Sequence, residues 1–508
     1  MKKDNIAKAS ILITILSIVS KAMGFLRVTA IGWQFGQGIE TDAYNSAIKL
    51  TAMSMNIVGT ALMTVLVPVL SHVKQRHGNR GKLKFFNNVS NIVIALSLVL
   101  MAIIFIFAPQ FLRLMYPDYG PDKFKLTVEL TRLGVPIIMG LGLMNIASSY
   151  LHSYHVYGPY AFMGIPFNLT FFVYLFFMPL SIEGLMMASI LAYLSQWLIQ
   201  VPAIHRTGYR WQPLIDVKDP YIHRTMALIV PTAIGQAVQQ INVIVDQNLA
   251  SGLADGTVSA LENATKINDA IIAIFIVGLT TVIFPLLSEA FDNKDNRRVV
   301  DLIELGISFI LLITIPATVG VLILSKDIVK IAFERGAFTA NDSIVTAGAL
   351  TFYSIGLIAN GMRHLISKVY YSLQDTKTPM INGMIAVGIN IVLNLLLVGP
   401  MQHKGLALST AISISAATLW MTIRLKSKLD ELDFMPIGIE FIKVSLAATI
   451  MGLVVYFSNN FLFGLGISQF IRLGAVVALA IIVYGLMVII TKTKSAVMVL
   501  DTIKAKIN

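Results

Sequence analysis

The chain has 508 residues, of which 56% are hydrophobic and only 13% charged, and its formal net charge is +12. A soluble core cannot bury so large an apolar share, whereas a bilayer can, so the composition excludes an ordinary soluble protein. Cysteine is absent, which excludes disulfides, thiolate metal sites and cysteine nucleophiles. Because no basic soluble domain is evident, we attribute the positive charge to loops that face anionic lipid, and no nucleic acid is expected as a partner.

Hydropathy, together with Gly, Pro and charge clusters, predicts an all-α membrane protein with about fourteen transmembrane helices. The first apolar run imitates a signal peptide, but no small-residue cleavage site follows it, so we interpret it as the first span. The predicted spans are residues 8–33, 41–71, 87–113, 127–154, 158–180, 182–204, 222–249, 257–289, 299–325, 343–371, 379–399, 404–424, 438–461 and 468–491.

The distribution of Lys and Arg predicts the orientation of these spans. An even number of spans places both termini on one side, and the loops on that side are the basic ones, as in residues 74–84, 206–224, 294–298 and 424–428. The opposite loops 34–41 and 251–256 contain no Lys or Arg, whereas Lys326, Lys330 and Arg335 are exceptions between spans 9 and 10. We therefore expect a multi-pass protein of the bacterial plasma (inner) membrane with both termini in the cytoplasm.

An internal repeat relates the two halves of the chain. Residues 47–50 (AIKL) match residues 264–267 (ATKI), and residues 65–71 match residues 282–288, both at an offset of 217. Spans 1–6 and 7–12 then form two six-helix lobes related by pseudo-twofold symmetry, with a site between them. We assign residues 1–206 to the N-terminal lobe, 207–428 to the C-terminal lobe and 429–508 to two additional C-terminal helices.

Among the cations within predicted spans, we single out Lys21, Arg27, Lys49 and Lys266 as candidates for one common cavity. A charge near the bilayer centre costs about 2.5–3.5 kcal/mol, so these side chains need an aqueous cavity or a partner. The repeat places Lys49 and Lys266 at equal depth in opposing lobes, which favours a polyanionic substrate between them. The alternative is internal pairing with the nearby acids Asp42, Glu262 and Asp269. We include Asp42 and Asp269 in the substrate-binding set.

A second polar group comprises Asp246 in span 7, Asn390 and Asn394 in span 11, and Thr410 in span 12. Carboxylate, amide and hydroxyl oxygens are the ligands of hard cations, so this set is a candidate Na⁺ site or proton relay. The alternative is an aspartate satisfied by interhelical hydrogen bonds. No other metal or organic cofactor is expected. Tyrosines near helix ends are interpreted as ordinary interfacial anchors.

Catalytic signatures are missing from the sequence. Residues 78–82 lack the spacing and the Ser or Thr of a phosphate-binding loop, and no His-Glu-x-x-His motif occurs. Ser46 and Lys49 fit a Ser-x-x-Lys pattern without its companion motifs. These absences favour a transporter over an enzyme.

Several short segments together resemble the MurJ/MviN family of lipid II flippases, in the multidrug/oligosaccharidyl-lipid/polysaccharide exporter superfamily. In that family an arginine at the position of Arg27 is essential, and relatives usually carry arginine where Lys21 and Lys266 stand. The segments that carry the resemblance are residues 20–27 (SKAMGFLR), 35–38 (FGQG), 41–44 (TDAY), 67–70 (VPVL), 336–339 (GAFT) and 371–379 (YSLQDTKTP).

The resemblance implies a flippase that moves lipid II, the undecaprenyl-pyrophosphate-linked disaccharide-pentapeptide of peptidoglycan synthesis, from the inner to the outer leaflet by alternating access. It also implies a groove for the lipid tail at spans 13 and 14. Coupling to Na⁺, H⁺ or the membrane potential is expected, with membrane lipids as the surroundings and a monomer as the working unit. The alternatives are an exporter of another polyprenyl-pyrophosphate-linked oligosaccharide and a cation-coupled drug exporter.

Overall fold

The computed structural model describes residues 3–373, 375–429 and 431–494. These residues form helices joined by loops, without a strand among them, which confirms the all-α fold class. Residue 374 of the segment 371–379 and both chain ends, for which a cytoplasmic location was predicted, lie outside the described residues.

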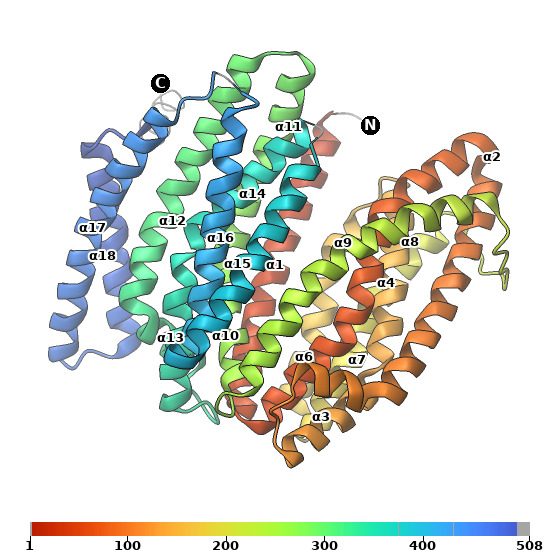
Figure 1. The fold of residues 1–508 in the computed structure, drawn as a ribbon, viewed down its shortest axis with the longest axis horizontal. Coiled ribbons are helices and arrows are strands. Elements are labelled where there is room, and N and C mark those ends of the chain that lie inside the picture. The colour runs from red at the N-terminus through yellow and green to blue at the C-terminus, as the bar shows by residue number, and fades with distance from the viewer. Residues whose placement is uncertain (1–2, 374, 430, 495–508) are drawn as a thin grey trace. The chain divides into compact units, whose positions relative to one another are not determined.

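The helices pack into two compact units (Figure 1). Unit 1 extends to Ser259 and also includes Arg335–Phe338, while unit 2 comprises Ala260–Glu334 and the chain from Thr339 onward. This division follows packing and differs from the lobes expected from the repeat, because the seventh predicted span belongs to unit 1. The division at residues 206/207 and 428/429 stays a prediction.

Unit 1 is built from nine helices of the described chain and the start of a tenth. They are α1 (Lys3–Phe35), α2 (Ile39–Met115), α3 (Pro121–Gly134), α4 (Pro136–His152), α5 (Gly158–Phe162), α6 (Gly164–Phe177), α7 (Ile182–Leu198), α8 (Val201–His205) and α9 (Pro220–Ser251). Helix α10 (Thr257–Ile271) begins in unit 1 and continues into unit 2.

Helix α2 combines the second and third predicted spans. Its backbone leaves the helical region at Gly78, where φ is 65°, a conformation that glycine adopts without a steric penalty. The arms on either side of Gly78 both pack on α4: a Cβ on Gly142 would lie 2.7 Å from Ser97 Oγ and 3.0 Å from Met55 Cε. The absence of a side chain at Gly142 therefore allows α4 to contact both arms.

Unit 2 follows from α10 through a π-helical segment, η1 (Ile272–Ile276). The remaining helices are α11 (Val277–Asp292), α12 (Asn296–Phe333), α13 (Ala340–Ile355), α14 (Leu357–Ser372), α15 (Lys377–Met401), α16 (His403–Lys426), α17 (Phe434–Gly464) and α18 (Gln469–Ile490). In Figure 1, α17 and α18 lie beside α12. Tyr484 of α18 donates a hydrogen bond to the carbonyl of Leu312 at 2.7 Å, which fixes this additional pair to α12.

Local structure repeats between the two halves. The α3–α4 pair bends by 43° at Val135, before Pro136, and the α13–α14 pair bends by 47° at Gly356. Ser71 and Ser288, at the repeat offset of 217, each donate a hydrogen bond to the carbonyl four residues earlier, at 3.0 and 3.1 Å. The matched bends agree with the repeat found in the sequence, whereas Ser-to-carbonyl bonds of this kind also occur in other helices.

The described residues contain nine helices that are long and apolar enough to cross a membrane, or up to eleven if each bent pair is one span. Helix α2 enters this count once although it breaks at Gly78. Every predicted span falls on a helix or on consecutive helices, yet the number fourteen stays a prediction.

Candidate functional site

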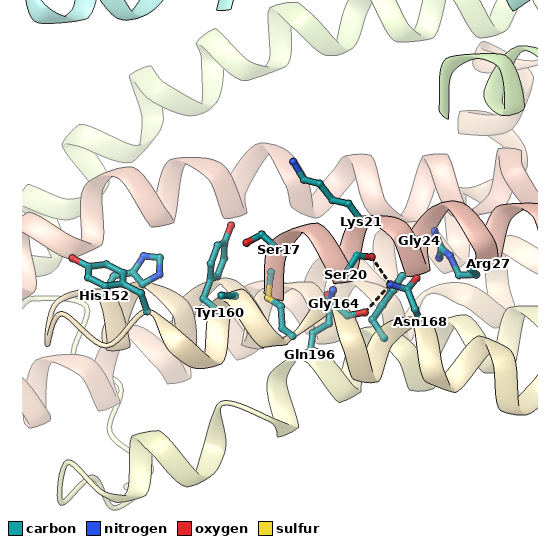
Figure 2. Close-up of a pocket in the computed structure, with 14 residues that line it drawn as sticks. Ser17, Ser20, Lys21, Gly24, Arg27, His152, Tyr160, Gly164, Asn168 and Gln196 are labelled. Carbon is teal, nitrogen blue, oxygen red and sulfur yellow. Dashed lines mark hydrogen bonds between the residues drawn. The ribbon is translucent and has the colours of Figure 1, made fainter. Parts of the chain in front are cut away.

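Unit 1 contains a cavity of about 590 Å³ between α1 and the α5–α6 segment (Figure 2). Both span 1 cations, Lys21 and Arg27, line it, as the sequence predicted for a common cavity. The other lining residues are Ser17, Ser20, Gly24, His152, Tyr157, Tyr160, Ala161, Met163, Gly164, Phe167, Asn168 and Gln196.

Arg27 is held by aromatic rings instead of by an acid. Its guanidinium carbon lies 4.9 Å from the ring centroid of Phe167 and 4.7 Å from that of Phe171. The Nε atom is buried without a hydrogen-bond partner, and among the described residues no carboxylate lies within ion-pair distance of Arg27. A cation held only by ring faces retains its hydrogen-bond donors for an anionic ligand.

A close crossing of α1 and α6 forms the middle of the cavity. A Cβ on Gly164 would lie 1.7 Å from Ser20 Oγ and 3.0 Å from Ser20 Cβ, so a larger residue at this position would displace the Ser20 side chain. Asn168 Nδ2 donates hydrogen bonds to the carbonyls of Ser20 and Gly164, at 3.2 and 2.7 Å (Figure 2). The Asn168 side chain is thereby fixed, while its Oδ1 is buried without a hydrogen-bond donor.

The other end of the cavity is aromatic. The ring of His152 lies 5.0 Å from the rings of both Tyr157 and Tyr160, at interplanar angles of 48° and 70°. The two tyrosines are 44% and 36% exposed, and His152 Nε2 is buried without a hydrogen-bond partner. Sequence reasoning missed these residues, because tyrosines near helix ends were interpreted as interfacial anchors.

Asp42 lies fully buried at the start of α2 and is saturated with donors. Its carboxylate accepts hydrogen bonds from Lys123 Nζ at 2.7 Å, from the backbone N–H groups of Gly256 and Ser259 at 2.8 Å each, and from Ser259 Oγ at 2.7 Å. Lys123 also pairs with Asp255 at 2.9 Å. Ser259 stands at the repeat-equivalent position of Asp42.

The predicted alternative of internal pairing therefore describes Asp42, but its partner is Lys123 and none of the four cations named from the sequence. Its carboxylate has no exposed surface for a substrate in this structure. The neighbouring Tyr119 hydroxyl hydrogen-bonds with Ser46 Oγ at 2.8 Å. Burial, and then the charge of Asp42, raise the pKa of Tyr119 well above its usual value, so its phenol stays neutral.

The remaining members of the predicted cationic set are distributed over both units. Lys49 is half-buried on α2 in unit 1. Lys266 and Asp269 are exposed on the part of α10 that belongs to unit 2. Convergence of Lys49 and Lys266 on one polyanion stays a prediction.

The candidate ion site is assembled in part. Asn394 Nδ2 donates to Asn390 Oδ1 at 3.0 Å, and Asn390 Nδ2 lies 3.4 Å from Thr410 Oγ1, so α15 and α16 bring three oxygen-bearing side chains together. Asp246 belongs to unit 1, where it accepts a hydrogen bond from Asn242 at 3.3 Å. Throughout the described chain, no group of three or more His, Asp or Glu side chains could hold a metal ion.

The sequence of the chain is similar to that of known proteins over most of its length. The family model described as Lipid II flippase MurJ matches residues 31–477. The probable lipid II flippase MurJ of Rickettsia prowazekii (strain Madrid E) is 26% identical over 412 residues, covering 80% of this chain and 81% of that protein. That of Treponema pallidum (strain Nichols) is 27% identical over 439 residues, covering 83% and 82%.

Solved structures share the fold. A lipid II flippase MurJ in an inward closed conformation superimposes with a TM-score of 0.80 at 24% identity, covering 97% of this chain and all of that one. An inward-facing multidrug resistance MATE family transporter of the MOP superfamily gives a TM-score of 0.67 at 12% identity, covering 82% and 99%. At these identities the likeness shows a shared fold.

Proposed function

Because the chain belongs to the lipid II flippase MurJ family, we propose that it translocates lipid II from the inner to the outer leaflet by alternating access. The observation within the chain that supports this function is Arg27, a cavity-lining guanidinium that has aromatic neighbours and no acidic partner among the described residues. A pyrophosphate supplies the missing counter-charge, and its oxygens suit the fork of guanidinium donors.

The cationic half of the cavity is proposed as the pyrophosphate site. Lys21 lines the same cavity six residues before Arg27, and its exposed ammonium adds a point charge beside the guanidinium. Lys49 and Lys266 are proposed to join this site when the lobes close, as their repeat-related positions suggest. No covalent chemistry is needed, because the substrate changes leaflet and keeps all its bonds.

The membrane placement is part of the proposal. The chain is an integral membrane protein with many candidate spanning helices. Its basic loops support the bacterial plasma membrane with both termini in the cytoplasm, because Lys and Arg are retained on that side. A monomer is proposed as the working unit, with α17 and α18 offering the lipid-facing groove for the polyprenyl tail.

Ion coupling is proposed at Asn390, Asn394 and Thr410. Their amide and hydroxyl oxygens are suitable ligands for Na⁺. We propose Asp246 as the carboxylate that balances the charge of the ion. These side chains would hold the ion, whose gradient would bias the direction of transport. The membrane potential supplies a further driving force of about 2.3 kcal/mol per elementary charge per 100 mV.

The test is translocation of lipid II by the purified protein in reconstituted vesicles with an imposed potential. Arg27→Ala should reduce the initial rate about tenfold or more, because a charge-assisted hydrogen bond is worth about 1.5–3 kcal/mol. Arg27→Lys should retain part of the rate, since it keeps the charge and loses the fork. The readout is the fraction of lipid II accessible from the opposite leaflet over time.

Arg298→Ala is the matched control, because Arg298 is an exposed arginine of α12 outside the cavity, and its rate should equal that of the unmodified protein. Absence of translocation by the unmodified protein would reject the proposed function. Unchanged translocation by Arg27→Ala would reject the assignment of the site. Substituting another polyprenyl-pyrophosphate-linked oligosaccharide for lipid II in the same vesicles tests the sibling-exporter alternative.

A further inference from the structure

The cavity of unit 1 is chemically divided along α1. Arg27 lies at one end and His152 and Tyr160 at the other, with the Ser20–Gly164 crossing between them (Figure 2). Tyr157 packs against the His152 ring and lines the same cavity. Ser17 and Arg27 are ten residues apart on α1, so the lined surface extends along about 15 Å of helix. A single phosphate group does not need so long a surface, and the aromatic end offers it no cation.

The aromatic end has the properties of a surface that recognises a sugar ring. Exposed ring faces carry negative partial charge, which attracts the C–H groups on the face of a pyranose. Tyr157 and Tyr160 are 44% and 36% exposed, and each packs against the His152 ring, which limits their motion. The faces are therefore available and held in place.

Unpartnered polar atoms complement these faces. Asn168 is only 3% exposed, both of its amide donor bonds go to helix backbone, and Oδ1 lacks a donor. His152 Nε2 at the aromatic end likewise has no partner. A buried polar atom without a hydrogen bond costs free energy, and the hydroxyl and amide groups of an N-acetylated sugar supply what both atoms lack.

We propose that His152, Tyr157 and Tyr160 form a glycan platform, which binds the disaccharide of the substrate while Arg27 and Lys21 bind its pyrophosphate. This inference rests on the proposed function. The order of groups agrees: the predicted topology places residues 152–160 at the cytoplasmic side and Arg27 deeper, while the lipid carries its sugars on the aqueous side of its pyrophosphate. The platform would thus distinguish a glycosylated carrier lipid from the bare one.

The experiment compares binding of lipid II and of undecaprenyl pyrophosphate, which lacks sugars, to the full-length protein in nanodiscs. The unmodified protein should bind lipid II more tightly. Tyr157→Leu and Tyr160→Leu should each weaken lipid II binding about three- to tenfold, the range expected for one aromatic contact, and leave binding of undecaprenyl pyrophosphate unchanged. Tyr157→Phe and Tyr160→Phe keep the ring faces and should retain the preference for lipid II.

Arg27→Ala serves as the opposite control, because it should weaken binding of both lipids. Equal affinity of the unmodified protein for the two lipids would overturn the platform and leave the flippase function intact. The platform would also be overturned if both Leu variants kept the preference for lipid II. The same holds if the Phe variants lost this preference as fully as the Leu variants. Failure of the unmodified protein to bind either lipid would reject the proposed function together with the platform. Melting temperatures of the variants establish that each is folded.

Discussion

Lys82 is a fully buried lysine four residues after the break of α2 at Gly78, in the predicted cytoplasmic loop between spans 2 and 3. Its ammonium lies 3.3 Å from the ring centroid of Tyr154 and donates a hydrogen bond to the carbonyl of Ser153 at 3.1 Å. Burial, and then the charge of Lys74, lower the pKa of Lys82 to about 8. The Lys82 side chain thus connects the region of α2 after Gly78 to the end of α4, without an acidic partner among the described residues.

This lysine predicts a specific dependence of stability on pH. The unfolded chain, with an ordinary lysine pKa of about 10.4, holds the proton over a range in which the folded chain has released it. The contribution of Lys82 to stability should therefore rise between pH 8 and about 10.4. Compared with Lys82→Met, the unmodified protein should gain melting temperature as the pH is raised through this window. A constant difference between the two proteins, measured in detergent at each pH, would contradict the assignment.

At the scale of single residues, the sequence identified charges better than it identified their partners. Lys21 and Arg27 could be predicted to share a cavity, because an intramembrane cation is costly wherever it lies. Lys123 could not be predicted to neutralise Asp42, since the two residues meet only after α2 and α3 have packed. Tyr160 was missed for the same reason: its proposed role depends on its packing against the His152 ring and not on its own sequence context.

At the scale of elements, the segment after α8 is fixed by three asparagines of α2. Asn88 is the central one: its Nδ2 donates to the carbonyl of Asp216 at 2.8 Å, and its Oδ1 accepts the backbone N–H of Asp216 at 2.7 Å. Asn87 and Asn91 make corresponding bonds to residues 210–214. The amide side chains here bond the backbone N–H and C=O groups that a neighbouring strand would otherwise bond.

Asn88→Ala should release this segment. Two hydrogen bonds are lost, each worth about 0.5–1.5 kcal/mol net, so backbone amides 210–218 should exchange hydrogen for deuterium faster while those of α4 are unaffected. Asn88→Asp keeps the acceptor oxygen and loses the N–H donor. Its exchange rate at residues 210–218 should therefore lie between those of the unmodified protein and Asn88→Ala. Hydrogen exchange with mass spectrometry in detergent measures this, and identical exchange in Asn88→Ala would show that the asparagines do not hold the segment.

The helices themselves were largely predictable, because apolar runs of bilayer length have few alternatives. The details that position the site were not. Nothing in the hydropathy of residues 222–249 indicates that α9 packs into unit 1, since packing partners do not enter a hydropathy profile. The π-helical segment Ile272–Ile276 lies within one copy of the repeat, where α2 is helical throughout the matching stretch.

At the scale of the whole molecule, two short motifs that were separate in the sequence contact each other. The N–H of Ala337 donates to the carbonyl of Trp33 at 2.8 Å. Gly36 has φ of 67°, and a Cβ there would lie 2.4 Å from the carbonyl oxygen of Ala337. The loop Arg335–Phe338 therefore belongs to unit 1, although the helices on either side of it belong to unit 2. An internal sequence repeat predicts which helices correspond to each other. It does not predict that a loop between two helices of one unit packs into the other unit.

The natural absence of cysteine makes the predicted topology directly testable, because each introduced cysteine is the only thiol in the chain. Glu183 stands at the outer end of the predicted span 182–204 and Lys330 in a predicted outer loop, while Lys218 and Arg298 lie in predicted cytoplasmic loops, and all four are exposed. In intact cells, a membrane-impermeant maleimide should label Glu183→Cys and Lys330→Cys but spare Lys218→Cys and Arg298→Cys. All four should react after permeabilisation, since accessibility then no longer depends on the side. Labelling of Lys218→Cys together with Glu183→Cys in intact cells would require an even number of spans between residues 183 and 218, which the single predicted span 182–204 does not allow.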